Sequence, residues 1–395
     1  MHNKLVSAAE AARLVHSGNT ITTSGFVGIG VPDALLAALA EAHSETGAPS
    51  GLTLIFAAGQ GDGRTLGLNR LAAPGLLARV IGGHWGLIPS VAKRALDGEI
   101  EAWNLPQGCI SQLYRDTAAG KPGTLSRIGL ETFVDPRSGG GAINARSTEE
   151  MVRLVEIAGE EMLFYKAHPI DVALLRGTTA DETGNVTMEN EALVLDNLAQ
   201  AMAVRNSGGV VLVQVARVVA ARSLSPREVI IPAPLVDAVV VAPPEQHVQT
   251  YATVYSPYYA GRLRAPREAA APAPLDARKI IARRAAFELP VNGVVNLGIG
   301  MPEGVAAVAA EEGLTEHVTL TAGADTTPLP INLDLVEPLG SEALLHARFG
   351  DDNLVFKAET QGDIAHLSGV GAVHVPAHLI KLFDAETGCA LNIGG

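Results

Sequence analysis

The sequence predicts an α/β protein with two similar, open, mostly parallel sheets, and three observations support this class. Apolar runs typical of buried strands alternate with helical runs along most of the 395 residues, as they do in parallel sheets covered on both faces. Ala, Val, Leu and Gly dominate the composition, whereas aromatic residues make up only 4% of it. The pattern Gly-Ile-Gly-x-Pro occurs twice, at Gly28–Pro32 and at Gly298–Pro302, which indicates an internal duplication.

We call Gly28–Pro32 the first glycine turn and Gly298–Pro302 the second. Each follows an apolar run and precedes a helical run, so glycine lets the backbone turn tightly and approach a ligand. Proline suits the first helical turn, and the helix N-terminus would present free N–H groups to an anion. One such turn is a common strand-to-helix connection, but two copies with matching flanks favour a shared ligand site. Its candidate residues are Gly28, Gly30, Gly298 and Gly300.

The elements around the two turns follow from caps and periodicity. Ser7 and Glu10 have capping-box spacing and predict a helix that ends at Gly18, and Asp276 predicts a capped helix over Ala277–Leu289. A further helix is expected over Asn190–Arg205, and another near Pro89. Expected strands include Leu52–Ala57, Glu160–Tyr165, Ala173–Gly177, Val210–Val215, Ala238–Val241 and Val318–Thr321.

The domain boundaries are predicted from changes in composition. A stretch rich in Ala, Pro and Arg around residues 262–275 has the character of a linker. We therefore expect a first lobe at residues 1–261 and a second lobe that begins at residue 276. The family resemblances given below imply that only the truncated start of this second lobe is present, at 276–325, and that a small all-β segment follows at 328–391.

Bulk composition limits the classes of function. Apolar residues make up 47% of the chain and charged residues 18%, which indicates a buried core, and the net charge of −13 argues against a nucleic-acid partner. The two cysteines lie far apart without metal-ligand spacing, so we expect a reducing compartment, no disulfide framework and no metal. No signal peptide or membrane-spanning run is recognisable, so we expect a cytoplasmic protein without a transmembrane segment.

Several motifs resemble the family I CoA-transferases, most closely the single-chain acetate/propionate/3-ketoacid type, over about residues 1–321. These motifs are His84–Pro89, Asn104–Gly108, Ala118–Thr124, Thr132–Arg137, Arg176–Asp181, Asn206–Gly209 and Asn296–Val305. The resemblance implies a duplicated α/β fold and a role in short-chain fatty acid metabolism or ketone body catabolism. It also implies acyl-CoA and a free carboxylate as substrates, no bound cofactor, and a homo-oligomer.

The resemblance further implies covalent catalysis by a glutamate. Its carboxylate attacks the acyl-CoA thioester to give a mixed anhydride, the CoA thiolate returns to give a glutamyl-CoA thioester, and a second carboxylate collects the CoA. In this family the glycine turns and the side-chain amide at Gln107 are where oxyanion donors are placed. A solvent-facing turn residue is the alternative for Gln107.

The expected glutamate is missing from its place after the second glycine turn. An ungapped match puts Gly323 in that place, whereas a two-residue gap matches Ala322 and Gly323 to the Ala-Gly that follows the glutamate, and neither supplies a carboxylate. The nearest one, Asp325, comes two residues late on a side chain one methylene shorter. Glu189 and Glu191 in the first lobe are weaker substitutes. A displacement of about 1 Å can cost roughly a hundredfold in rate, so we expect CoA transfer to be lost or severely reduced. A non-catalytic binder of acyl-CoA or carboxylate is the alternative function.

The C-terminal part resembles a different family. Leu333–Gly350 and Val375–Gly388 are similar to the small TOBE (OB-like) domain of ATP-binding subunits from sugar-type ABC importers, over about residues 328–391. The sequence contains no Walker A motif, so the ATPase of such a subunit is absent. We expect a fusion of unrelated pieces, which allows a transporter-associated role; an unusual β-rich tail of the enzyme is the alternative.

A dinucleotide-binding dehydrogenase is disfavoured because both glycine turns lack the Gly-x-Gly-x-x-Gly spacing of dinucleotide-binding proteins.

Overall fold

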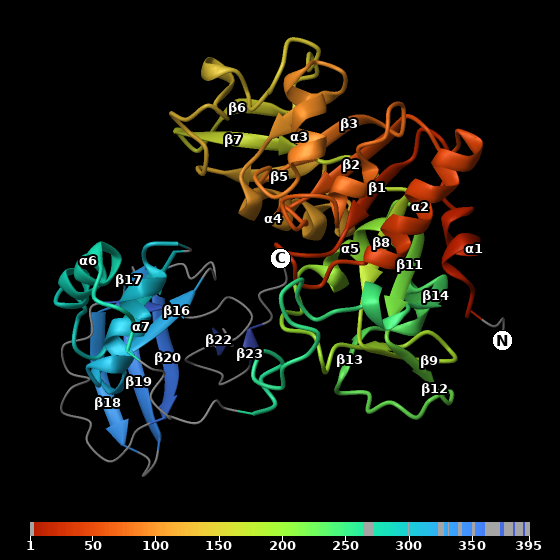
Figure 1. The fold of residues 1–395 in the computed structure, drawn as a ribbon. Coiled ribbons are helices and arrows are strands. Elements are labelled where there is room, and N and C mark those ends of the chain that lie inside the picture. The colour runs from red at the N-terminus through yellow and green to blue at the C-terminus, as the bar shows by residue number, and fades with distance from the viewer. Residues whose placement is uncertain are drawn as a thin grey trace. The chain divides into compact units, whose positions relative to one another are not determined.

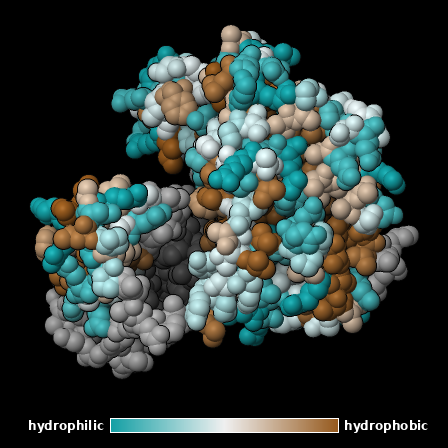
Figure 2. All heavy atoms as spheres, in the orientation of Figure 1, coloured by the Kyte–Doolittle hydropathy of each residue, from teal (hydrophilic) through white to brown (hydrophobic). Residues whose placement is uncertain are grey.

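The computed structural model describes residues 4–263, 272–298 and 300–322, and the backbone of seven further strands between 328 and 391. The chain forms two compact units, Met1–Ala265 and Pro266–Gly395, and each is considered by itself (Figure 1). Among the described residues, no helix is both long enough and apolar enough to cross a membrane. On the face of the first unit seen in Figure 2, hydrophilic and apolar residues are interspersed.

A seven-stranded sheet forms the centre of the first unit, in the order β14-β11-β8-β1-β2-β3-β4 (Figure 1). All neighbouring strands in it are parallel. The strands are β1 (Thr20–Thr23), β2 (Leu52–Phe56), β3 (Leu77–Gly82), β4 (Glu101–Asn104), β8 (Val172–Arg176), β11 (Val210–Val215) and β14 (Ala238–Val241). Strands β2 to β4 extend the sheet on one side of β1 and the later strands extend it on the other, so the order of the strands reverses at β1.

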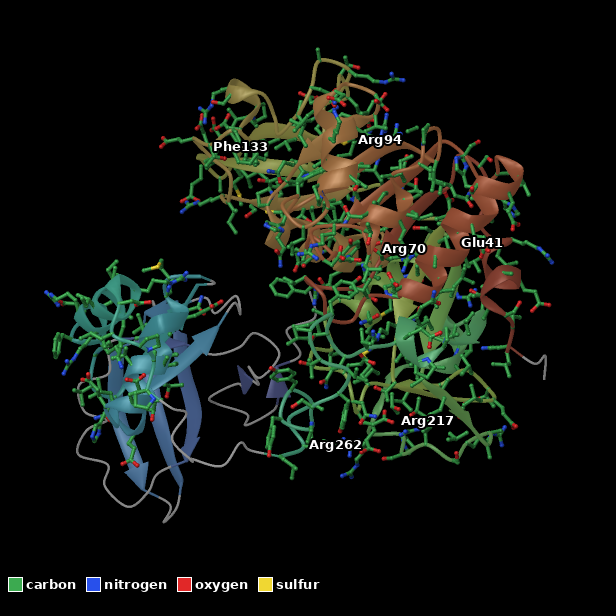
Figure 3. The ribbon with its side chains drawn as sticks, in the orientation of Figure 1. Glu41, Arg70, Arg94, Phe133, Arg217 and Arg262 are labelled. Carbon is green, nitrogen blue, oxygen red and sulfur yellow. The ribbon has the colours of Figure 1, made fainter. Side chains whose placement is uncertain are left out.

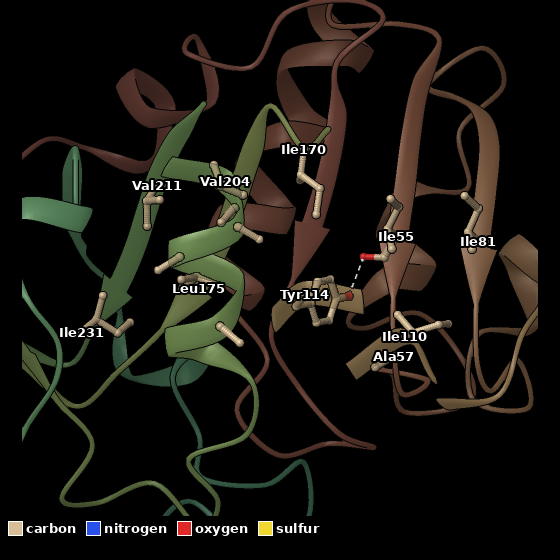
Figure 4. Close-up of a cluster of buried hydrophobic side chains, with 14 of the residues drawn as sticks. Ile55, Ala57, Ile81, Ile110, Tyr114, Ile170, Leu175, Val204, Val211 and Ile231 are labelled. Atoms are coloured by element: carbon tan, nitrogen blue, oxygen red, sulfur yellow. Dashed lines mark hydrogen bonds between the residues drawn. The ribbon is translucent and has the colours of Figure 1, made fainter. Parts of the chain in front are cut away.

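Helices cover both faces of this sheet, as a fully parallel sheet requires. They are α1 (Ala8–Ala12), α2 (Asp33–Thr46), α3 (Pro89–Leu96), α4 (Gln107–Ala118) and α5 (Asn197–Asn206). Successive residues of β8 point to opposite faces: Val172 and Leu174 join the core formed with α1, α2 and α3. Ala173 and Leu175 join the core formed with α4 and α5, which Figure 4 shows.

Two smaller sheets complete the first unit. The first, in the order β5-β7-β6, is antiparallel and contains β5 (Gly123–Ser126), β6 (Val152–Ile157) and β7 (Glu160–Lys166). The second, in the order β12-β9-β10-β13, contains β9 (Thr179–Asp181), β10 (Val186–Thr187), β12 (Arg217–Val219) and β13 (Val229–Ile231). Since β9 follows β8 directly, this second sheet borders the end of the central one.

The second unit begins with a helix and a parallel strand pair. Its elements are α6 (Ala277–Ala286), β15 (Gly293–Leu297), α7 (Glu303–Glu311) and β16 (Val318–Ala322). Later come the antiparallel strands β17 (Pro328–Pro330), β18 (Asn332–Pro338), β19 (Glu342–Phe349), β20 (Asp352–Glu359), β21 (Ala372–His374), β22 (Leu382–Phe383) and β23 (Ala390–Leu391). The predicted α/β class, with a large parallel sheet and β strands towards the C-terminus, is confirmed.

Three helices differ from the prediction. The helix expected from Asn190 begins only at Asn197, because Leu195 has a left-handed φ of +57° that a right-handed helix excludes. The first helix has the predicted capping box but ends at Ala12, well before Gly18. The helix capped by Asp276 ends at Ala286 rather than at Leu289.

Candidate functional site

The first glycine turn lies at the carboxyl end of β1, the strand at which the order of the sheet reverses. Open parallel sheets bind ligands in the crevice outside the carboxyl ends of their strands at such a point. The fold therefore places Gly28 and Gly30 where a ligand site is expected.

Backbone hydrogen bonds fix the conformation of this turn. Phe26 and Ile29 exchange N–H···O bonds of 2.9 Å in both directions, and the Val27 N–H donates to the Gly59 carbonyl at 2.9 Å. Gly30 has a φ of +66°, and Val27 has a φ of +57°. A positive φ is strained for a β-branched residue such as valine. The surrounding contacts therefore hold the turn in a conformation that it would not adopt alone.

Both glycines in the turn are needed for packing within the protein. A Cβ on Gly28 would lie 2.7 Å from Cδ2 of Tyr251, and a Cβ on Gly30 would lie 2.9 Å from Cδ1 of Leu195. The sequence predicted that glycine permits close approach, and the structure shows two side chains of the same chain making that approach.

The prediction that α2 offers free N–H groups to an anion is wrong. Oε1 of Gln214 accepts hydrogen bonds from the N–H groups of Ala34 (2.9 Å) and Leu35 (3.3 Å). Asp33 adds a negative charge at the same helix end and makes a bidentate ion pair with Arg70, which Figure 3 labels. Since Gln214 comes from β11, far along the chain, no local sequence signal could have revealed this cap.

Gln107 is the first residue of α4, directly after the exit from β4, and its side chain is exposed. It lines a small hollow at the carboxyl ends of β1 and β2. The other lining residues are Thr23, Ser24, Gly25, Phe26, Ala57, Ala58, Gln60, Ser111, Leu195, Asp196 and Gln200. The hollow thus brings Gln107 next to the segment that leads into the first glycine turn, and a side-chain amide there can donate to a ligand oxygen.

The second glycine turn belongs to the second unit. Gly298 follows β15 and Gly300, with a φ of +95°, precedes α7. A Cβ would find open space at Gly300 and only an ordinary contact of 3.8 Å at Gly298. The juxtaposition of the two turns in one site remains a prediction, and Gly323 and Asp325 lie outside the described residues.

Glu191 is buried in an ion cluster rather than exposed to a ligand. Its Oε2 lies 3.0 Å from Nε of Arg176 and its Oε1 lies 3.5 Å from Nε2 of His247, and all three side chains are at least 94% buried. Burial opposes ionisation of Glu191, but His247 and Arg176 outweigh it and hold its pKa below the usual value. Burial also lowers the pKa of His247, against the opposing effect of Glu191.

Glu189 is occupied in a similar way. Its carboxylate accepts hydrogen bonds from the hydroxyls of Thr179 and Thr187 and forms an ion pair of 2.8 Å with Arg217, which Figure 3 also labels. Burial raises the pKa of Glu189, but these hydrogen bonds lower it more, so that it lies below the usual value. Neither first-lobe glutamate is available as a nucleophile in this conformation.

Comparison with known proteins identifies the family. The family model for coenzyme A transferases matches residues 5–242, which is most of the first unit and more than half of the chain. The chain belongs to the coenzyme A transferase family. The match includes the first glycine turn, Gln107, Arg176 and Glu191, whereas His247 lies just beyond its end.

Relatives in the coenzyme A transferase family extend the similarity into the second unit. A caffeate CoA-transferase of Acetobacterium woodii is 44% identical over 319 residues, which are 80% of this chain and 61% of that protein. The acetate CoA-transferase YdiF of Escherichia coli K12 is 38% identical over 82% of this chain and 61% of its own length. The crystal structure of YdiF from E. coli O157:H7 in a thioester complex with CoA has a TM-score of 0.77 at 38% identity, covering 82% of this chain and 62% of that chain.

The chain thus spans about 61% of the length of these two curated CoA-transferases. Sequence reasoning had singled out Arg176–Asp181 as a family motif without giving Arg176 a role. It missed Tyr251, Gln214 and His247 entirely, because their contacts with Gly28, with α2 and with Glu191 form only after long-range folding.

Proposed function

We propose that this chain binds an acyl-CoA thioester and a carboxylate at the carboxyl edge of its seven-stranded sheet, as a CoA-transferase by descent. The observation that carries the proposal is the hollow shared by Gln107 and the segment before the first glycine turn. It lies at the point of strand reversal in a chain of the coenzyme A transferase family. The amide of Gln107 would donate to the thioester oxygen as negative charge develops on it.

We further propose that transfer by this chain alone is lost or severely reduced. In the family reaction a carboxylate attacks the thioester carbonyl, the C–S bond breaks, and the CoA thiolate leaves. The thiolate then attacks the glutamyl carbonyl of the resulting anhydride, its C–O bond breaks, and the acyl group leaves as a free carboxylate while a glutamyl-CoA thioester forms. In the sequence, neither an ungapped match, which puts Gly323 in the place of the family's glutamate, nor a match with a two-residue gap supplies a carboxylate there, and Asp325 is displaced from that place. Glu189 and Glu191 are engaged in ion pairs. Asp196, the carboxylate that lines the hollow, accepts a hydrogen bond from Ser111 and pairs with Arg115.

The proposed substrates are short-chain acyl groups of the acetyl, propionyl and acetoacetyl type, which would place the protein in short-chain fatty acid or ketone body metabolism. The relatives named for acetate and caffeate support carboxylic acids as acceptors. The test is incubation with acetyl-CoA and propionate, followed by detection of propionyl-CoA and of a CoA–protein adduct by mass spectrometry. We expect neither product at a substantial rate; robust turnover would show that another carboxylate serves as nucleophile.

The second candidate function is a binding protein without turnover, and the strands from β17 onward are the observation that favours it. They are antiparallel, which agrees with a TOBE-like segment at residues 328–391 that could dock onto a transporter. Calorimetry with acetyl-CoA tests for a ligand binder, and a pull-down with importer subunits tests for a docking module.

We also propose that the protein is cytoplasmic and forms a homo-oligomer. Cell fractionation would check the location, and sedimentation analysis would check the oligomeric state.

A further inference from the structure

Four buried side chains from separate parts of the chain meet beneath the first glycine turn. Arg176 ends β8, Glu191 lies in the loop before α5, Gln214 belongs to β11, and His247 follows the short helix Pro244–Gln246. We call these four residues the buried polar cluster. None of them reaches the surface sufficiently to bind a ligand directly, since their side chains are almost completely covered.

The hydrogen-bond directions within the cluster are determined by its chemistry. The Gln214 amide uses Oε1 as the acceptor for α2, so its Nε2 faces Nδ1 of His247 at 3.1 Å and donates to it. Neutral histidine then carries its proton on Nε2, which faces Glu191. The cluster therefore joins Arg176, Glu191 and His247 by ion contacts of 3.0 and 3.5 Å, and His247 to the start of α2 by the hydrogen bonds of Gln214.

The cluster reaches both the first glycine turn and the segment that covers it. Nη1 of Arg176 donates to the carbonyl of Val31 in the turn at 3.4 Å and to the carbonyl of Val248 at 2.8 Å. A few residues beyond Val248, the ring of Tyr251 packs against Gly28. Arg176 thereby ties together the turn and its covering segment, and Glu191 neutralises the charge of Arg176.

We infer that Glu191 is a positioning residue, which keeps Arg176 buried so that the cluster holds the first glycine turn in the conformation that receives acyl-CoA. Removing one partner of a buried ion pair leaves the other charge uncompensated, so Arg176 would move toward water and release Val31 and Val248. The positive φ of Val27 gives the turn strain to relieve once it is released. That the ligand is acyl-CoA rests on the proposed function. That the cluster fixes the conformation of the first glycine turn does not depend on it.

The test compares two variants with a control. Glu191→Gln removes the negative charge, whereas Arg176→Met combined with Glu191→Leu removes both charges. Asp116→Asn is the control, because Asp116 is also buried and ion-paired, with Lys121 at 2.9 Å, but lies outside the cluster. Each is measured by thermal melting, by hydrogen exchange of the peptide covering residues 26–36, and by calorimetry with acetyl-CoA.

We expect Glu191→Gln to speed exchange in residues 26–36 while β2 stays protected, and to weaken acetyl-CoA binding about tenfold, the effect of losing about 1.4 kcal/mol. The double variant should recover the melting temperature, because no lone charge remains buried. It should not recover slow exchange or affinity, because the bonds to Val31 and Val248 stay lost. Asp116→Asn should lower the melting temperature alone.

Unchanged exchange of residues 26–36 in Glu191→Gln would overturn the inference, as would a double variant whose affinity returns together with its stability. If the unaltered chain does not bind acetyl-CoA, the proposed function fails. The exchange measurement still decides whether the cluster holds the turn, since it needs no ligand.

Discussion

At the scale of single residues, the two glycine turns look alike in sequence but differ in what surrounds them. Gly28 lies against the Tyr251 ring, whereas Gly298 has only an ordinary contact with Pro302. The same substitution at equivalent positions therefore separates the effect of packing from the effect of backbone freedom.

We predict that Gly28→Ala destabilises the first unit by about 1–3 kcal/mol, the usual cost of overpacking. Gly298→Ala is the matched control and should change stability by less than about 0.5 kcal/mol, as substitutions without a steric conflict do. Urea unfolding of the two variants measures the difference. Equal effects at both positions would contradict the close approach of Tyr251.

Histidine protonation provides a second prediction at this scale. Burial lowers the pKa of His247 from 6.5, so the unfolded chain binds this proton more readily than the folded chain does. The stability linked to His247 is therefore complete above about pH 6.5 and is lost as the pH falls below it.

We expect His247→Gln to flatten the decline of unfolding free energy between pH 7 and pH 5. Urea titrations at several pH values measure the slopes of the variant and of the wild type. A steeper decline in His247→Gln than in the wild type would reverse the assigned direction.

At the residue scale, the sequence indicated which residues lie at the candidate site better than it indicated which side chains contact them. The glycines of the first turn and Gln107 were found because turn chemistry and family motifs are local in the sequence. The partners Tyr251, Gln214 and His247 were not found, since a glutamine in β11 carries no mark that it will cap α2. The anion site predicted at α2 failed for the same reason.

At the scale of elements, α4 packs on the central sheet through an apolar core and is also hydrogen-bonded to it by the Tyr114 hydroxyl. Tyr114 on α4 is buried, and its hydroxyl accepts a hydrogen bond of 3.0 Å from Thr22 of β1 and donates to the carbonyl of Ile55 of β2 at 3.4 Å (Figure 4). The helix that begins with Gln107 is thus positioned from its middle by this tyrosine.

Tyr114→Phe should cost about 1–3 kcal/mol, because the buried Thr22 hydroxyl loses its acceptor. Combining it with Thr22→Val should cost less than the sum of the two single changes, since both partners of the bond are then gone. Chemical denaturation of the four proteins in this cycle gives the coupling. Strictly additive losses would mean that the hydrogen bond does not connect α4 with β1.

The sequence predicted strands more reliably than helix ends. Val210–Val215 and Ala238–Val241 are strands with the predicted bounds, because continuous apolar runs report burial directly. The start of α5 was wrong because residues 190–196 are shaped by Glu191 and by the left-handed Leu195. Those constraints arise from tertiary contacts and leave no local pattern.

At the scale of the whole molecule, the two units differ in the size of their described cores. The first has two extensive apolar clusters, on the two faces of its sheet. The core described for the second consists of Ala282, Ala286, Val305 and Val308, with Ile280, Ile281 and Phe287 exposed beside it. Since buried apolar area is the main source of stability, the described part of the second unit should be the weaker one.

We predict that calorimetry of the full chain shows two thermal transitions, and that a fragment of residues 1–263 melts with the higher one. The exposed apolar residues of the second unit should also make the full chain poorly soluble or oligomeric, whereas the fragment should stay in solution. A soluble monomer that unfolds in one sharp transition would contradict this picture. The fold class was predictable at this scale because it depends on the alternation of strands and helices, which extends along most of the sequence.

The central position of β1 also determines when the seven-stranded sheet can close around it during synthesis, because β1 needs a neighbouring strand on each side. Its pairing with β2 becomes possible early, but its other neighbour, β8, begins only at Val172. At about 5–20 residues per second, a ribosome needs roughly ten seconds to make the intervening chain. Throughout that interval one edge of the nascent sheet is open to strands of other molecules, so this family member should depend on chaperones during translation more than after it.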